Sequence, residues 1–266
     1  FDEVLRILHG SQESGVPRPG SPCASQLGKL LLELGCEYVA SVRIQCSCNL
    51  AGFRFPPACD RTERIEVERL LASAFSRLAG VGLPGTYLPL AGSSSHVPRP
   101  EGMTPEEEAE LERHHLLFRA PMSKEQLAAG LGRHWPEGRG VFAADSRRLV
   151  AWCNEVDHLR LVSLQPGGDL EEAFDRFSRA LGSLECSLER KGHTLARSRE
   201  RGCLTTCPAS LGLQAGVTLR LPLLSSQPGF QETCHGLGLR ARRAASARPA
   251  DSASGAWEVA NRCMLG

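Results

Sequence analysis

The chain has 266 residues, of which 41% are hydrophobic and 23% are charged, and its formal net charge is +1 at pH 7. This length can bury a full hydrophobic core, and the composition is that of an ordinary globular protein. The near-zero net charge gives no argument for nucleic acid or a membrane surface as a partner, and no apolar run approaches the roughly 18 residues of a membrane span.

Expected elements in the first half begin after residues 1–36, a poorly defined segment in which 27–34 favours a short helix. Residues 38–44 alternate like a strand. Asp60 is a helix N-cap for 61–79, and 81–100 is rich in Gly, Ser and Pro, which predicts a loop. Thr104 and Pro105 open another helix that runs to about residue 114.

In the second half, strands are predicted at 141–142, 148–153 and 159–164, followed by a long amphipathic helix over 170–190. Two more strands at 203–207 and 216–221, a helix at 230–237 and a mobile loop over 241–255 complete the chain. Strands that arrive in neighbouring pairs between long helices predict an α+β fold, an antiparallel sheet flanked by helices.

Eleven cysteines are scattered along the chain, apart from a C-x-C at Cys46 and Cys48 and a C-x-x-x-C at Cys203 and Cys207. Neither spacing is that of a structural zinc site, so we expect no metal held by cysteine. The odd number favours reduced thiols and hence a cytoplasmic protein. Because the chain begins with Phe1, we expect a trimmed or partial sequence.

Polar residues are densest between the strands predicted at 148–153 and 159–164. Five of them fall in one bend: Asn154, Glu155, Asp157, His158 and Arg160. Carboxylates beside an Arg are suited to orienting a cationic substrate or to general-base catalysis. From the residues alone, this segment is equally well a solvated turn.

The stretch from Trp152 to Arg160, W-C-N-E-V-D-H-L-R, resembles the W-x-N-E-E-D-H-L-R signature of the phosphagen (ATP:guanidino) kinases, the creatine kinase and arginine kinase family. Trp135–Gly140 is similar to W-P-x-x-R-G, and Leu204–Gly212 to L-T-x-C-P-x-N-L-G. An S-x-R strand at 41–43 and an H-F-L-F-like stretch at 115–118 also fit. Several motifs in the right order make a specific signal, which covers about residues 37 to 261.

The resemblance implies that residues 37–266 form the C-terminal catalytic domain, with the glutamine synthetase-like fold of that family, and end before its final helix. The family transfers the γ-phosphoryl group of Mg·ATP to a guanidine, so ATP, Mg²⁺ and a guanidino substrate are the implied ligands. Glu155 and Cys207 are the implied catalytic residues. The implied nucleotide-binding residues are Ser41, Arg43, His115, Arg139, Arg160 and Arg242.

Several positions depart from the family pattern. Two phosphate-binding Arg positions hold Gln45 and Gln214, and the second acid of N-E-E-D is Val156. The R-G-T-G-G loop reads R-R-A-A-S from Arg242. We therefore expect a catalytically impaired pseudokinase with a residual nucleotide-binding or scaffold role. The alternative is an active creatine or arginine kinase-type enzyme in which Glu155 is the base.

Other roles stay open at this point. Cys207 is either a reactive thiol or a small buried residue. We expect His158 to be structural, and Trp135 and Trp152 to be core aromatics rather than adenine-stacking residues. Without the family's closing helix, the sheet or the 170–190 helix should expose an apolar strip that binds a protein partner or a second copy, unless residues 1–34 cover it.

Overall fold

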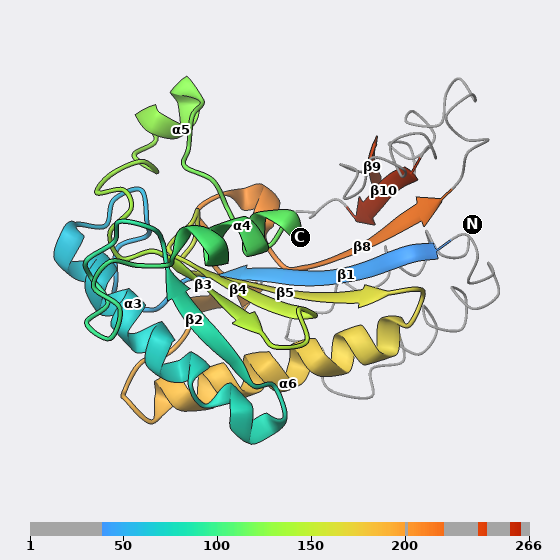
Figure 1. Ribbon diagram of the computed structural model, residues 1–266, viewed down its shortest axis with the longest axis horizontal. Coiled ribbons are helices and arrows are strands. Elements are labelled where there is room, and N and C mark those ends of the chain that lie inside the picture. The colour runs from blue at the N-terminus through green and yellow to red at the C-terminus, as the bar shows by residue number, and fades with distance from the viewer. Residues whose placement is uncertain (1–38, 200–201, 221–238, 244–255, 262–266) are drawn as a thin grey trace. The chain divides into compact units, whose positions relative to one another are not determined.

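The computed structural model describes residues 39–199, 202–220, 239–243 and 256–261. The helices expected at 27–34 and 230–237 lie outside these ranges. Strands and flanking helices confirm the α+β class with an antiparallel sheet (Figure 1). The chain forms two compact units: the first contains residues 1–45, 163–178 and 213–266, and the second contains 46–162 and 179–212.

Three elements run through both units: the strands β1 (Val39–Cys48) and β5 (Leu159–Pro166), and the helix α6 (Leu170–Glu189). The apolar face of α6 is buried, and the covering role that residues 1–34 were expected to take lies outside the described residues. The buried residues of this helix are Leu170, Ala173, Phe174, Arg176, Phe177, Ala180, Leu181, Leu184, Ser187 and Leu188. No helix in the described ranges is long and apolar enough to cross a membrane.

In the second unit the strand order is β2-β3-β4-β5-β1, with β2 (Gly85–Pro89), β3 (Gly140–Ala144) and β4 (Leu149–Cys153) paired antiparallel. The prediction of a loop throughout 81–100 is wrong, because β2 lies inside it. Its turn-forming flanks hide the strand in the sequence. Pairing with β3 satisfies its backbone groups, and Gly85 is required there because a Cβ would come within 2.5 Å of the Ala143 carbonyl oxygen.

The helix α3 (Arg61–Phe75) begins with the expected Asp60 cap, which forms a capping box with Glu63. It ends four residues before the predicted end, and a 3₁₀ turn, η1 (Leu78–Val81), follows. Phe75 stacks on Tyr87 of β2 and Phe142 of β3, with ring centroids 5.7 and 5.2 Å apart. These contacts seat the helix on the sheet.

Two shorter helices complete this part of the second unit. In α4 (Pro105–Arg113), Thr104 is the N-cap as predicted and forms a capping box with Glu107. The helix α5 (Lys124–Ala128) has a similar box at Ser123.

The end of the second unit differs from the sequence prediction. Instead of one strand over 203–207, the chain forms β6 (Arg197–Ser198), β7 (Gly202–Cys203) and a 3₁₀ turn, η2 (Pro208–Ser210). The strand stops early because the backbone N–H of Thr206 donates to the carboxylate of Asp157 instead of to a neighbouring strand.

In the first unit the order is β5-β1-β8-β10-β9, with β8 (Leu213–Arg220), β9 (Leu239–Arg243) and β10 (Ala256–Asn261). The strand β10 pairs antiparallel with both neighbours. The loop predicted from residue 241 is therefore wrong for 241–243, which belong to β9, and its remainder lies outside the described residues.

Candidate functional site

The polar bend between β4 and β5 is a fixed turn rather than a solvated loop. Asn154 adopts a left-handed conformation (φ 55°) and is fully buried. Its Nδ2 donates to the carbonyl oxygens of Gly138 at 2.6 Å and Arg64 at 3.0 Å. Its backbone N–H donates to the carbonyl oxygen of His158 at 2.9 Å. These bonds fix the direction in which the next side chains point.

Asp157 points into the protein, where it joins three segments of the second unit. Its Oδ1 accepts hydrogen bonds from Nδ2 of Asn49 at 2.7 Å and from the backbone N–H of Thr206 at 2.6 Å. Asn49 also bonds to the backbone of His158 and of Leu204. Asp157 therefore positions the Leu204–Cys207 segment, while its other oxygen, Oδ2, is buried without a hydrogen-bond partner in the structure.

His158 is structural, as expected. The backbone N–H of Leu50 donates to its Nδ1 at 3.0 Å, so the ring proton is on Nε2, which faces the carbonyl oxygen of Arg54 at 3.1 Å. Burial of the ring lowers its pKa to about 4. The imidazole is therefore neutral at pH 7.

Glu155 and Arg160 are the part of the bend that remains partly open to solvent. Their closest atoms, Oε2 and Nη2, are 3.4 Å apart, and the two side chains are 19% and 22% exposed. Burial raises the pKa of Glu155, and the charge of Arg160 only partly opposes this. The same Oε2 accepts from the backbone N–H of Val156 at 2.9 Å.

Arg160 is held from two further sides. Its Nε donates to the hydroxyl of Ser47 at 3.3 Å, and its guanidinium carbon lies 5.5 Å from the ring centroid of Trp152. This guanidinium combines a fixed direction with partial exposure, which are the properties that a phosphate-binding Arg needs.

Trp152 and Trp135 both pack on Phe118, with centroid distances of 5.6 and 5.9 Å, as expected of core aromatics. The indole N–H of Trp152 donates to the carbonyl oxygen of Leu116 at 2.6 Å. The preceding residue, His115, is exposed and has a positive φ of 55°. Its nucleotide-binding role stays a prediction.

Arg139 lies in a different environment from Arg160. It is 0% exposed, and it donates to the backbone carbonyls of Leu131 at 2.8 Å, Arg133 at 3.1 Å and Glu137 at 3.3 Å. Burial, and next the charge of nearby Arg64, lower its pKa to about 9. Backbone carbonyls therefore enclose this guanidinium in the structure, and its nucleotide-binding role stays a prediction.

Cys207 is exposed, so the buried alternative for this thiol is wrong. It directly precedes η2, and the hydroxyl of Thr205 donates to its carbonyl oxygen at 2.8 Å. Its catalytic role stays a prediction.

The remaining candidates belong to the first unit. Ser41 and Arg43 lie on β1 and are half-buried. Arg242 lies on β9, where its register partner is Glu258 of β10. On β1, Nε2 of Gln45 donates to Oε1 of Gln214, so these two residues, which stand at Arg positions of the resembled family, are bonded to each other.

Sequence reasoning missed Asn49 and Arg64. Asn49 lies in no recognised motif, although it connects Asp157, His158 and Leu204. Arg64 is fully buried and donates to the carbonyl oxygen of Pro56 at 2.8 Å. The only sequence signal for a structural role of Arg64 is that a charged residue falls on the face of α3 that is buried.

The fold is that of the guanidino kinases. The crystal structure of a lombricine kinase superposes with a TM-score of 0.76 at 30% identity, over 97% of this chain and 68% of that one. A duplicated taurocyamine kinase from Schistosoma mansoni, with bound transition state analog components, gives a TM-score of 0.73 at 29% identity, over 97% of this chain and 32% of that one.

Sequence comparison agrees. The family profile described as ATP:guanido phosphotransferase, C-terminal catalytic domain, matches residues 66–266, and the chain belongs to this family. It is 35% identical to the M-type creatine kinase of Gallus gallus, over all of this chain and 67% of that protein. It is 34% identical to the flagellar creatine kinase of Strongylocentrotus purpuratus, of which it spans 22%.

Proposed function

We propose that this chain is an ATP:guanidino phosphotransferase domain whose phosphoryl transfer is impaired and that keeps a weak nucleotide-binding or scaffold role. The hydrogen bond between Gln45 and Gln214 carries this proposal. Transfer of a phosphoryl group depends mainly on positioning and on cations that stabilise the charge spread over the phosphate oxygens. Two neutral amides that bond to each other offer no such charge.

The size of the effect follows from the lost contacts. A hydrogen bond to a charged group is worth roughly 1.5–3 kcal/mol, so two missing Arg–phosphate contacts forfeit roughly 3–6 kcal/mol. Each 1.4 kcal/mol is about tenfold in affinity, which gives a loss of roughly 10²–10⁴-fold for ATP.

The acid–base chemistry is also incomplete. Where the resembled pattern has a second acid, this chain has Val156, which neither accepts a proton nor pairs with a guanidinium. Of the two carboxylates in the bend, Asp157 is buried and bonded to Asn49 and Thr206. Glu155 is partly open to solvent, and Arg160 and the Val156 backbone already occupy its Oε2. One carboxylate with these partners is poorly placed to grip and deprotonate a guanidine.

The second candidate is an active kinase with Glu155 as its base. The observation that favours it is the raised pKa of Glu155, because burial moves this carboxylate toward the working pH of a general base. In that case the substrate is a guanidine such as creatine, arginine, lombricine or taurocyamine, and Glu155 takes a proton from the attacking nitrogen.

The described residues fit a nucleotide in part. Arg160 is fixed and partly exposed, as a phosphate ligand must be, whereas Arg139 is fixed but fully buried. We assign Arg139 the role of positioning the 131–137 segment. For Ser41, Arg43, His115 and Arg242, a nucleotide-binding role rests on the family resemblance alone. Mg²⁺ would be held mainly by the ATP phosphates and water, since no group of three or more His, Cys, Asp or Glu in the described ranges is arranged as a metal site.

A coupled phosphoryl-transfer assay with Mg·ATP and each of the four guanidines tests the proposal. We expect no turnover above background, and Glu155→Gln should leave that background unchanged. Turnover near the ~1–100 s⁻¹ that is typical of kinases, lost in Glu155→Gln, would establish the second candidate instead.

A further inference from the structure

Three cysteine thiols meet in the second unit, two of them on either side of Ser47, whose hydroxyl accepts from Arg160. The Sγ atoms of Cys46 and Cys48 on β1 are 3.7 Å apart, and Cys48 shares a thiol–thiol hydrogen bond with Cys203 of β7. Cys46 and Cys48 are buried, whereas Cys203 is partly exposed. The proposed function uses none of the three.

The backbone of Ala196, the residue before β6, connects the residues that follow β1 and β7, and this connection brings Cys48 and Cys203 near each other. The backbone N–H of Ala196 donates to the carbonyl oxygen of Asn49 at 2.7 Å, and that of Leu204 donates to the carbonyl oxygen of Ala196 at 2.8 Å. The side chain of Asn49 adds a bond to the carbonyl oxygen of Leu204 at 3.1 Å. Cys48 and Cys203 immediately precede Asn49 and Leu204.

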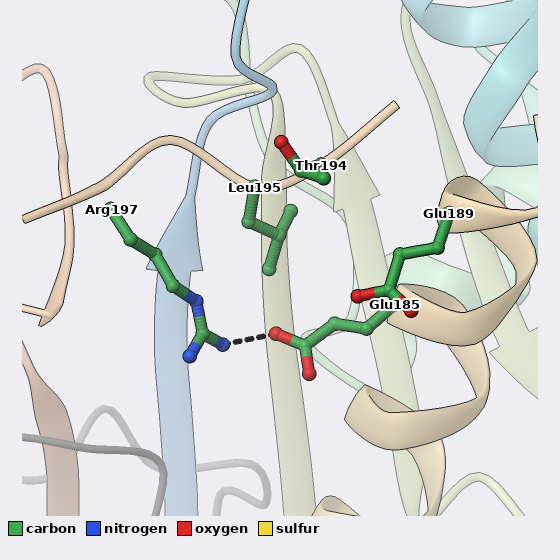
Figure 2. Close-up of a pocket in the computed structure, with 5 residues that line it drawn as sticks. All are labelled: Glu185, Glu189, Thr194, Leu195 and Arg197. Carbon is green, nitrogen blue, oxygen red and sulfur yellow. Dashed lines mark hydrogen bonds and ion pairs between the residues drawn. The ribbon is translucent and has the colours of Figure 1, made fainter. Parts of the chain in front are cut away.

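One cation lies next to this cluster. Arg197 is the register partner of Cys203, forms an ion pair with Glu185, and lines a pocket of about 170 Å³ together with Glu189, Thr194 and Leu195 (Figure 2). Its charge favours the thiolate forms of Cys48 and Cys203.

Other effects outweigh this cation. The hydrogen bond to Cys48, together with burial, raises the pKa of Cys203. The bond from Cys203 lowers the pKa of Cys48, but Cys46 and burial raise it by more. Both groups are therefore thiols at pH 7, and only their minor thiolate fraction reacts.

We propose that Cys48 and Cys203 form a redox pair that closes to a disulfide under oxidising conditions. A pair within β1 fits less well, because residues two apart on a strand have Cα atoms separated by about 6.6 Å, near the upper end of the roughly 4.4–6.8 Å found in disulfides. A metal site also fits less well, since these three thiols do not form a metal-binding group within the described part of the chain.

The chemistry needs a two-electron oxidant, for which a small disulfide such as oxidised glutathione suffices. The Cys203 thiolate, the more accessible of the two, attacks one sulfur of the oxidant, which releases one glutathione thiolate and leaves a mixed disulfide. The Cys48 thiolate then attacks the Cys203 sulfur and releases the second glutathione. The two protein thiols lose two protons and two electrons, and one glutathione disulfide becomes two glutathione thiols.

Peptide mapping of the full chain after equilibration in glutathione buffers of increasing oxidising strength tests this proposal. We expect a linked Cys48–Cys203 peptide, absent in Cys48→Ala and in Cys203→Ala and retained in Cys186→Ala, an exposed-thiol control. Below the raised thiol pKa values, the rate of its formation should rise about tenfold per pH unit, as the thiolate fraction does.

Two results would overturn the proposal. One is the absence of the linked peptide in the unmodified chain under conditions that glutathionylate exposed Cys186 and Cys207. The other is a Cys46–Cys48 link in its place. Neither result depends on how the alanine variants fold.

Discussion

Removal of the Asp157 carboxylate should destabilise the protein strongly, because this group holds the Leu204–Cys207 segment in place. Asp157→Ala deletes the bonds from Asn49 at 2.7 Å and Thr206 at 2.6 Å in a site where the residue is 1% exposed. Two bonds to a charged acceptor at roughly 1.5–3 kcal/mol each give a loss of about 3–6 kcal/mol. That is a large part of the roughly 5–15 kcal/mol stability of a typical protein.

Guanidinium denaturation followed by tryptophan fluorescence measures this loss. Asp145→Ala is the matched control, because Asp145 is exposed, and its free energy of unfolding should stay within about 0.5 kcal/mol of the parent. A loss below about 1 kcal/mol in Asp157→Ala would refute the view that this carboxylate secures the segment.

Three further predictions concern stability. His158 has a folded pKa of about 4 against about 6.5 unfolded, so the unfolded state binds the proton first as the pH falls. The contribution of neutral His158 to the free energy of unfolding is therefore fully present above about pH 6.5, and about 3 kcal/mol of it is lost toward pH 4. Urea titrations at several pH values should find this pH dependence weaker in His158→Gln. Asp60→Ala removes the α3 cap and should cost about 1 kcal/mol in thermal denaturation, whereas no change would mean that the box is not formed. Glu155→Gln should cost less than about 0.5 kcal/mol at pH 7, because burial already disfavours the charged form; a loss above about 1 kcal/mol would show that the pair with Arg160 outweighs burial.

Helix starts were predictable because their signals are local. The Asp60 and Thr104 caps were predicted and both form, and the structure adds Glu63 and Glu107 as the second residues of capping boxes. The strands β2 and β9 were missed because each has only five residues next to turn-forming or polar sequence. Both strands are stabilised by pairing with strands that are distant in sequence, and a local sequence pattern cannot indicate such pairing.

In the candidate site, too, contacts between residues close in sequence were predictable, and contacts between distant residues were not. Glu155 and Arg160 are close in sequence, and the structure brings them into contact. The bond between Gln45 and Gln214 joins residues far apart along the chain, and the sequence alone indicates neither the pairing nor its consequence. Arg139 and Arg160 look alike as motif residues. Their burial separates them, because one guanidinium is enclosed by backbone carbonyls and the other is partly exposed.

Titration calorimetry of Mg·ATP into the parent chain and the double variant Gln45→Arg/Gln214→Arg tests the central claim most directly. We expect weak or undetectable binding to the parent and an affinity that is roughly 10²–10⁴-fold tighter in the double variant, since two charge-assisted contacts are restored. Met122→Arg, which adds a charge at a residue that is 84% exposed, should leave the affinity unchanged. Micromolar binding by the parent, with no gain in the double variant, would show that Gln45 and Gln214 do not impair the nucleotide site.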